Sequence, residues 1–135
     1  MLNNYKLTTT YNGVHDITEN VIKTVEESGI SEGTCIVYTP HSTAGLTVFS
    51  PWDPAGFVDL DEEIRRLIPT KVDFKHQHDT PQDAAGHIKS ALLGVSIPLI
   101  VHGGKLLLGG SQHVYFLEFD GPRNREYFVK VQADR

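Results

Sequence analysis

Histidines are the residues of this 135-residue chain that most clearly suit chemistry, and there are seven of them. Histidine is the commonest metal ligand and the usual proton carrier near neutral pH. His41 lies in a short polar segment between two apolar stretches, and His76 and His78 precede a segment that carries His87. Three imidazoles from separate segments suit Zn²⁺, which lowers the pKa of a water molecule that it binds. The alternative for each of them is an ordinary hydrogen-bonded histidine in a turn or in the core.

These histidines converge only if particular elements position them. If the chain is extended around His76, alternation places His76 and His78 on the same side, and the residues alone leave open which one is the ligand. Thr80-Pro81 predicts the start of a helix, with a threonine cap and proline at the first helical position. Because alanines lie three residues before and four residues after it, His87 is predicted to face inward on this helix.

Acidic and basic side chains form two further candidate groups near the C-terminus. On a strand period of two, Glu118 shares a face with Val114 and Phe116, which predicts a partly buried carboxylate that needs a partner cation or a raised pKa. The alternative is a glutamate at a sheet edge that reaches solvent. Arg123 and Arg125 flank a turn and suit a bidentate anion clamp, the alternative being two ordinary surface arginines.

The surrounding pattern predicts one α+β domain over residues 1–135. Helices are expected over residues 16–29, 57–68 and 80–94, and early strands over residues 5–11, 34–39 and 46–49. From residue 96 on, short glycine-rich turns separate four expected strands, which indicates a mostly antiparallel sheet with a C-terminal meander covered by about three helices. These four strands span residues 97–102, 105–108, 112–120 and 125–132.

Composition excludes several classes of protein. Hydrophobic residues make up 39% of the chain, which favours a packed core over disorder. No apolar run reaches the roughly 18 residues of a membrane span, and the first residues show no secretory signal. Cys35 is the one cysteine, so a reducing cytoplasm is expected. A net charge of −5 argues against general nucleic-acid binding.

Three motifs follow one another in the chain: Pro40-His41-Ser42-Thr43-Ala44-Gly45-Leu46, His87-Ile88-Lys89-Ser90 and Leu93-Gly94-Val95-Ser96. Together with the stretch from Ser96 to Gly109, and with Gln112 and Val114, they resemble the YjbQ-like family, also called the secondary thiamine-phosphate synthase family. The resemblance runs from about Tyr5 to the C-terminus. It implies a compact α+β subunit that assembles as a homotrimer, with a divalent metal held by histidines and carboxylates near the subunit boundary.

The resemblance also implies roles for particular residues. His41 falls on the family's first histidine and His87 on the histidine in the helix. A further family histidine stands eleven positions before the helical one, which favours His76, with His78 as the fallback. The expected metal ligands are therefore His41, His76 and His87.

The family's second name implies a transferase reaction that joins a hydroxymethylpyrimidine diphosphate to a thiazole phosphate with loss of pyrophosphate. Such a site holds two anions in one pocket. Asp83 and Glu118 fall on acidic family positions and are expected to orient a ligand histidine or to move a proton. The cofactor is a divalent metal, with Zn²⁺ suiting an all-histidine site and Mg²⁺ the usual partner of diphosphates. The residues expected to bind the substrate anion are Thr43, Gln112, Arg123 and Arg125.

Two other functions fit the same residues. One is a zinc-dependent hydrolase of a small phosphorylated or acyl substrate, assisted by Glu118 or Asp79. The other is a trimeric metal- or anion-binding module without enzymatic activity. In each case the expected partner is a small molecule, and neither a nucleic acid nor a membrane.

Overall fold

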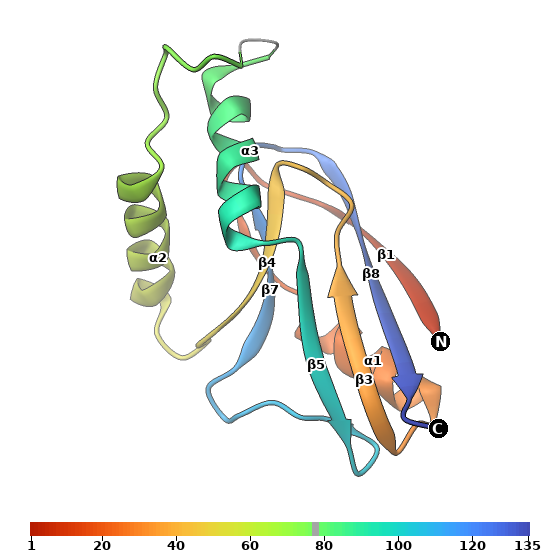
Figure 1. Ribbon diagram of the computed structural model, residues 1–135. Coiled ribbons are helices and arrows are strands. Elements are labelled where there is room, and N and C mark those ends of the chain that lie inside the picture. The colour runs from red at the N-terminus through yellow and green to blue at the C-terminus, as the bar shows by residue number, and fades with distance from the viewer. Residues whose placement is uncertain (77–78) are drawn as a thin grey trace.

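The computed structural model describes residues 1–76 and 79–135 (Figure 1). Its helices and its mostly antiparallel strands confirm the predicted α+β class. The helices are α1 (Thr18–Ser28), α2 (Pro54–Leu67) and α3 (Pro81–Leu93). The strands are β1 (Leu2–Thr8), β2 (Val14–Asp16), β3 (Glu32–Tyr38), β4 (Ala44–Phe49), β5 (Ser96–His102), β6 (Lys105–Leu106), β7 (His113–Glu118) and β8 (Asn124–Ala133).

The described strands form two sheets. The larger sheet has the order β1-β8-β3-β5-β6 and the smaller one the order β2-β7-β4. Every pairing is antiparallel, and β3 lies between β5 and β8, so that Val37 faces both Ile97 and Val129. The first and last strands of the chain are therefore joined side by side within the larger sheet, where β1 pairs with β8.

The four C-terminal strands do not form the single meander that the glycine-rich turns indicated. The β5–β6 hairpin forms, and Gly103 and Gly104 at its turn have positive φ angles of 59° and 76°. Strand β7 then leaves for the centre of the small sheet, and β8 inserts between β1 and β3. The physical reason is that β7 is buried on both faces from Val114 to Glu118, which requires a covering layer on each side. Strand β2, which supplies one edge of the small sheet, was not expected.

The main core lies between the two sheets and α1. Its buried side chains come from α1, from the inner face of β3 and β8, and from one face of the small sheet; they include Val21, Val25, Val37, Phe116 and Val129. A second apolar group covers the opposite face of the small sheet, where Tyr115, Leu117 and Phe119 pack with Phe49 and with Phe57 of α2. The helices α2 and α3 thus lie on the outer side of the small sheet (Figure 1).

Helix α3 begins and ends as its sequence predicts. Thr80 Oγ1 accepts a hydrogen bond from the backbone N–H of Asp83 at 3.1 Å, Pro81 stands in the first turn, and Gly94 follows the last turn. Across residues 1–76 and 79–135, the structure contains no helix long and apolar enough to cross a membrane.

One face of the larger sheet stays open. Strand β3 alternates strictly between buried and exposed residues, and its exposed side carries Ile36 and Tyr38, which are 42% and 44% exposed. On the neighbouring strand β5, Ile100 is 59% exposed on the same side, because it pairs with Thr34 of β3. An apolar strip therefore runs across the middle of the open face.

Candidate metal centre

Two histidines and an aspartate meet at the N-terminal end of α3. The Nε2 atoms of His76 and His87 each lie 3.3 Å from Oδ2 of Asp83. The potential ligand atoms of these three residues all lie within 4.8 Å of one another. In the described part of the chain, this is the one group of three or more histidine, cysteine or acidic side chains with such spacing. We call it the His76–Asp83–His87 cluster.

Local structure explains why these three residues converge. Asp83 and His87 are four residues apart on α3 and so share one side of the helix. The cap at Thr80 holds the first turn of α3, where Asp83 stands. His76 arrives from the preceding segment, which is anchored where Phe74 packs against the buried start of α3. The two imidazole rings meet edge to face, with centroids 5.2 Å apart.

The geometry of the cluster suits a divalent metal ion. Two ligands that each lie about 2.0–2.1 Å from a tetrahedral Zn²⁺ are about 3.3 Å from one another. Both histidine–carboxylate distances have this value. Two histidines with one carboxylate are also a donor set of catalytic zinc sites, in which the fourth position stays open. The side chain of Asp83 is only 10% exposed, so its carboxylate is partly shielded from water.

Arg123 lies directly beside the cluster. Its Nη2 is 2.6 Å from Asp120 Oδ2, 3.6 Å from Asp79 Oδ2 and 3.9 Å from Asp83 Oδ1. The hydrogen bond from Arg123 to Asp120 is the main cause of a raised pKa at Arg123, which keeps the guanidinium charged. Because 43% of the Arg123 side chain is exposed, its guanidinium is accessible to a ligand from solvent and lies next to the carboxylate of Asp83.

Arg125 lies in a different environment from Arg123. It is buried against Glu118, with Nε 2.8 Å from Oε1, and its Nη2 also donates to Thr43 Oγ1 at 2.7 Å. Glu118 is 1% exposed and Arg125 is 6% exposed, so the expected buried carboxylate has the partner cation that it needs. Burial by itself raises the pKa of Glu118. The hydrogen bonds from Arg125 and Thr9 outweigh this effect, so the pKa of Glu118 lies below its ordinary value. An anion that bound Arg125 would have to displace Glu118.

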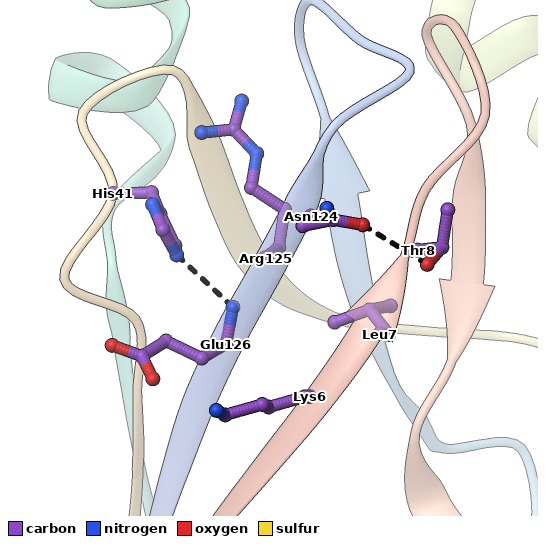
Figure 2. Close-up of a pocket in the computed structure, with 7 residues that line it drawn as sticks. All are labelled: Lys6, Leu7, Thr8, His41, Asn124, Arg125 and Glu126. Carbon is purple, nitrogen blue, oxygen red and sulfur yellow. Dashed lines mark hydrogen bonds between the residues drawn. The ribbon is translucent and has the colours of Figure 1, made fainter.

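His41 is not part of the His76–Asp83–His87 cluster, and Figure 2 shows its ring directed toward the backbone of Glu126. Its Nε2 accepts a hydrogen bond from the backbone N–H of Glu126 at 3.0 Å. Burial first, and then the charge of Arg125, hold the pKa of His41 below its ordinary value. His41 lines a pocket of about 490 Å³ with Lys6 and Asn124, and a second pocket of about 340 Å³ that His87 also lines. Its role as a third metal ligand stays a prediction.

The other predicted residues are dispersed. Thr43 is buried and accepts the hydrogen bond from Arg125, which joins the loop after β3 to β8. Gln112 accepts a hydrogen bond from the backbone N–H of Gly109 at 2.8 Å, at the opposite end of β7 from Glu118. His78, the fallback ligand, lies outside the described residues.

The sequence reasoning missed two features of this site. It expected Asp83 to orient a ligand histidine or to move a proton and did not consider it as a ligand itself, although Asp83 Oδ2 lies 3.3 Å from Nε2 of both histidines. The four-residue spacing of Asp83 and His87 on one predicted helix could have indicated this. It also missed the part that Asp120 plays in holding Arg123 beside the cluster, which the opposite charges of these two residues, three positions apart around one turn, could have indicated.

Comparison with known proteins identifies the family. The chain matches the family described as UPF0047 protein YjbQ-like over residues 3–134. It belongs to the YjbQ-like UPF0047 family. A YjbQ-like relative from Methanocaldococcus jannaschii, UPF0047 protein MJ1081, is 40% identical over 120 residues, which cover 89% of this chain and 85% of that protein. UPF0047 protein YugU of Bacillus subtilis is 37% identical over 120 residues, covering 87% and 88%.

Solved structures of YjbQ-like proteins share the fold. An uncharacterised conserved protein of the YjbQ/UPF0047 family from Clostridium acetobutylicum is 40% identical, with a TM-score of 0.90 over 96% of this chain and 99% of that one. A protein of unknown function from Sulfolobus solfataricus is 27% identical, with a TM-score of 0.93 over 99% and 97% of the two chains. The α+β architecture described above is therefore that of the YjbQ-like family.

Proposed function

We propose that this protein binds a divalent metal ion, best suited to Zn²⁺, at His76, Asp83 and His87, and uses it to bind a small phosphorylated molecule. The observation that carries the proposal is the pair of 3.3 Å histidine–carboxylate distances, which equal the edge of a tetrahedral zinc site. Magnesium is the weaker candidate, because it prefers oxygen ligands and two of the three side chains offer nitrogen.

Charge favours an anionic ligand at this site. Two neutral imidazoles and one carboxylate contribute a single negative charge, so a bound divalent ion would leave a net positive charge with an open coordination position. Such an ion would supply electrostatic stabilisation to phosphoryl oxygens. Arg123, held 2.6 Å from Asp120, would donate hydrogen bonds to the same anion from its exposed side. The two oxygens of Asp83 would lie between the metal ion and Arg123, with Oδ2 toward the ion and Oδ1 3.9 Å from Arg123 Nη2.

The reaction proposed first for this site is the transfer implied by the family's second name, in which a diphosphate leaves and a thiazole phosphate is joined. A homotrimer that works in the cytoplasm is part of the same proposal. Burial raises the pKa of the Cys35 thiol to about 11, which keeps it unreactive.

Metal binding is tested with chelated protein titrated with Zn²⁺. We expect one ion per chain, and we expect His76→Ala, Asp83→Asn and His87→Ala each to weaken Zn²⁺ binding on the order of 100-fold or more, because a ligand contributes more than an outer-sphere partner. His102→Ala is the matched control, because His102 also lies beside a carboxylate, at 2.9 Å from Glu32, without a third ligand among the described residues.

Unchanged Zn²⁺ affinity in all three cluster variants, with folding intact by circular dichroism, would contradict the metal centre. The transfer reaction is tested separately, by mixing both thiamine precursors with zinc-loaded and with chelated protein. A rate that depends on zinc and falls in Arg123→Gln supports the transfer. If the zinc-loaded and the chelated protein both show negligible rates, the transfer reaction is contradicted. The metal centre is then still judged by the zinc titration alone.

A further inference from the structure

A lysine is buried on α3, on the side away from the metal centre. Lys89 is 4% exposed, although lysine is among the residue types least often buried. It stands two positions after His87, which on a helix places the two side chains on nearly opposite sides. The structure thus commits a full cationic side chain to the interior between α3 and the end of α2.

In the described parts of the chain, no carboxylate lies within ion-pair distance of this lysine. Among the hydrogen bonds of the described residues, and the ion pairs within 4.0 Å, none involves the Lys89 ammonium. The nearest carboxylate by its electrostatic effect is Asp61, whose two oxygens are already engaged. Asn12 Nδ2 donates to Oδ1 at 2.7 Å, and Arg65 Nη2 lies 2.9 Å from Oδ2. Among the described residues no fully buried side-chain nitrogen or oxygen lacks a hydrogen-bond partner, so the Lys89 ammonium keeps some accessible surface although the residue as a whole is 4% exposed.

Lys89 lines a pocket of about 320 Å³ that also offers hydrogen-bond donors. Arg65 is a second basic residue of the lining, and Tyr11, Asn12 and Gln82, whose side chains carry hydrogen-bond donors, line the same pocket. With Asp61 counted against the two cations, the local charge is +1. None of the residues lining this pocket belongs to the His76–Asp83–His87 cluster.

We propose that this pocket between α2 and α3 is a second ligand site, which binds a phosphate group with Lys89 and Arg65 as its two cations. A tetrahedral oxyanion accepts hydrogen bonds from several directions, which matches an ammonium, a guanidinium and amide donors around one space. The pocket is larger than a phosphate ion, so it has room for the organic part of a small phosphate ester as well.

A phosphate group in this pocket would place an anion beside both Lys89 and Arg65. This site is independent of the proposed metal centre, and its test does not require a metal ion.

The test is a titration of the full-length protein with inorganic phosphate, followed by amide chemical shifts. The expected shifts lie at residues 61–70, at the end of α2, and they are the same before and after chelation of metal ions. Lys89→Met should weaken phosphate binding at least tenfold, and Arg65→Gln should weaken it as well. Lys105→Met, which removes the same charge from the exposed strand β6, is the matched control and should leave the affinity unchanged.

Lys89→Met also has a second expected result that guards against misfolding. Because methionine keeps much of the apolar stem and removes the buried charge, the variant should unfold at the same or a higher temperature in phosphate-free buffer. Repeating the titration with glycerol 3-phosphate distinguishes an ester from free phosphate, since tighter binding of the ester assigns the remaining volume to an organic group. Equal phosphate affinity in the wild type, Lys89→Met and Arg65→Gln, or shifts confined to residues around Arg123, would overturn the proposal.

Discussion

Glu118 and Arg125 form a buried pair of opposite charges that connects several segments of the fold. The carboxylate accepts from Arg125 and from Thr9, and the guanidinium also bonds to Thr43. These contacts tie β7, β8 and the loop after β3 to one point in the interior. The role of Glu118 in catalysis stays a prediction, and its stabilising role can be measured separately.

Glu118→Gln is expected to destabilise the protein by about 3–5 kcal/mol, because removal of one partner leaves the other charge buried and unpaired. Chemical denaturation at pH 7 measures this loss. The double variant Glu118→Gln with Arg125→Met should recover part of it, since no unpaired charge then remains. A single variant as stable as the wild type would show that the pair does not hold these segments together.

Helix α3 is the element on which both proposed sites depend. One side of α3 carries Asp83 and His87, and the opposite side carries Lys89. The helix starts at a threonine cap, so the position of Asp83 in the first turn depends on the hydrogen bond that its own backbone donates to Thr80. Fraying of this turn would separate Asp83 from the histidines without removing any ligand.

Thr80→Ala is therefore expected to lower stability by about 1 kcal/mol and to weaken Zn²⁺ binding about fivefold, which is the same energy expressed as affinity. Asp53→Ala is the matched control. Asp53 caps α2 through the backbone N–H of Ala55 at 2.9 Å, so its loss should cost similar stability and leave Zn²⁺ affinity unchanged. The measurements are thermal unfolding and zinc titration. Equal zinc affinity in wild type and Thr80→Ala would show that the cap does not position Asp83.

At the level of the whole molecule, the open face of the larger sheet is the main surface without a covering layer. The exposed side of β3 presents Ile36 and Tyr38 next to Ile100 of β5, and exposed apolar strips of this kind mark contact surfaces. If the chain assembles as the homotrimer proposed above, we expect this face to form the contact between its copies.

Ile36→Glu is expected to convert a trimer into single chains, because three carboxylates would be buried without partners. Size-exclusion chromatography with light scattering measures the mass of the assembly in solution. Val72→Glu is the control, since Val72 is 87% exposed and lies away from the open face. Wild-type protein with the mass of one chain would contradict the homotrimer, and a trimeric Ile36→Glu variant would move the contact to another surface.

Local patterns in the sequence determined most of the elements and their ends. The cap, proline and glycine around residues 80–94 predicted α3 correctly, because these signals act within one helical turn. Alternation predicted the burial of Glu118 beside apolar residues, and the motifs predicted the family. His87 and the pair of His76 and His78 were singled out on residue type and spacing, and the resemblance to the family then favoured His76 over His78.

Tertiary structure alone decided which residues meet. Strand order depends on burial summed over a whole layer, so the sequence did not show that β7 would enter the small sheet and β8 the large one. Arg123 pairs with Asp120 within the turn between β7 and β8, and Arg125 pairs with Glu118 across that turn, but only the folded structure shows that Arg125 is buried and Arg123 is partly exposed. Tertiary packing also leaves Lys89 buried with no contacting carboxylate among the described residues, since Asp61 pairs with Arg65 on its own helix and with Asn12, which is distant in the sequence.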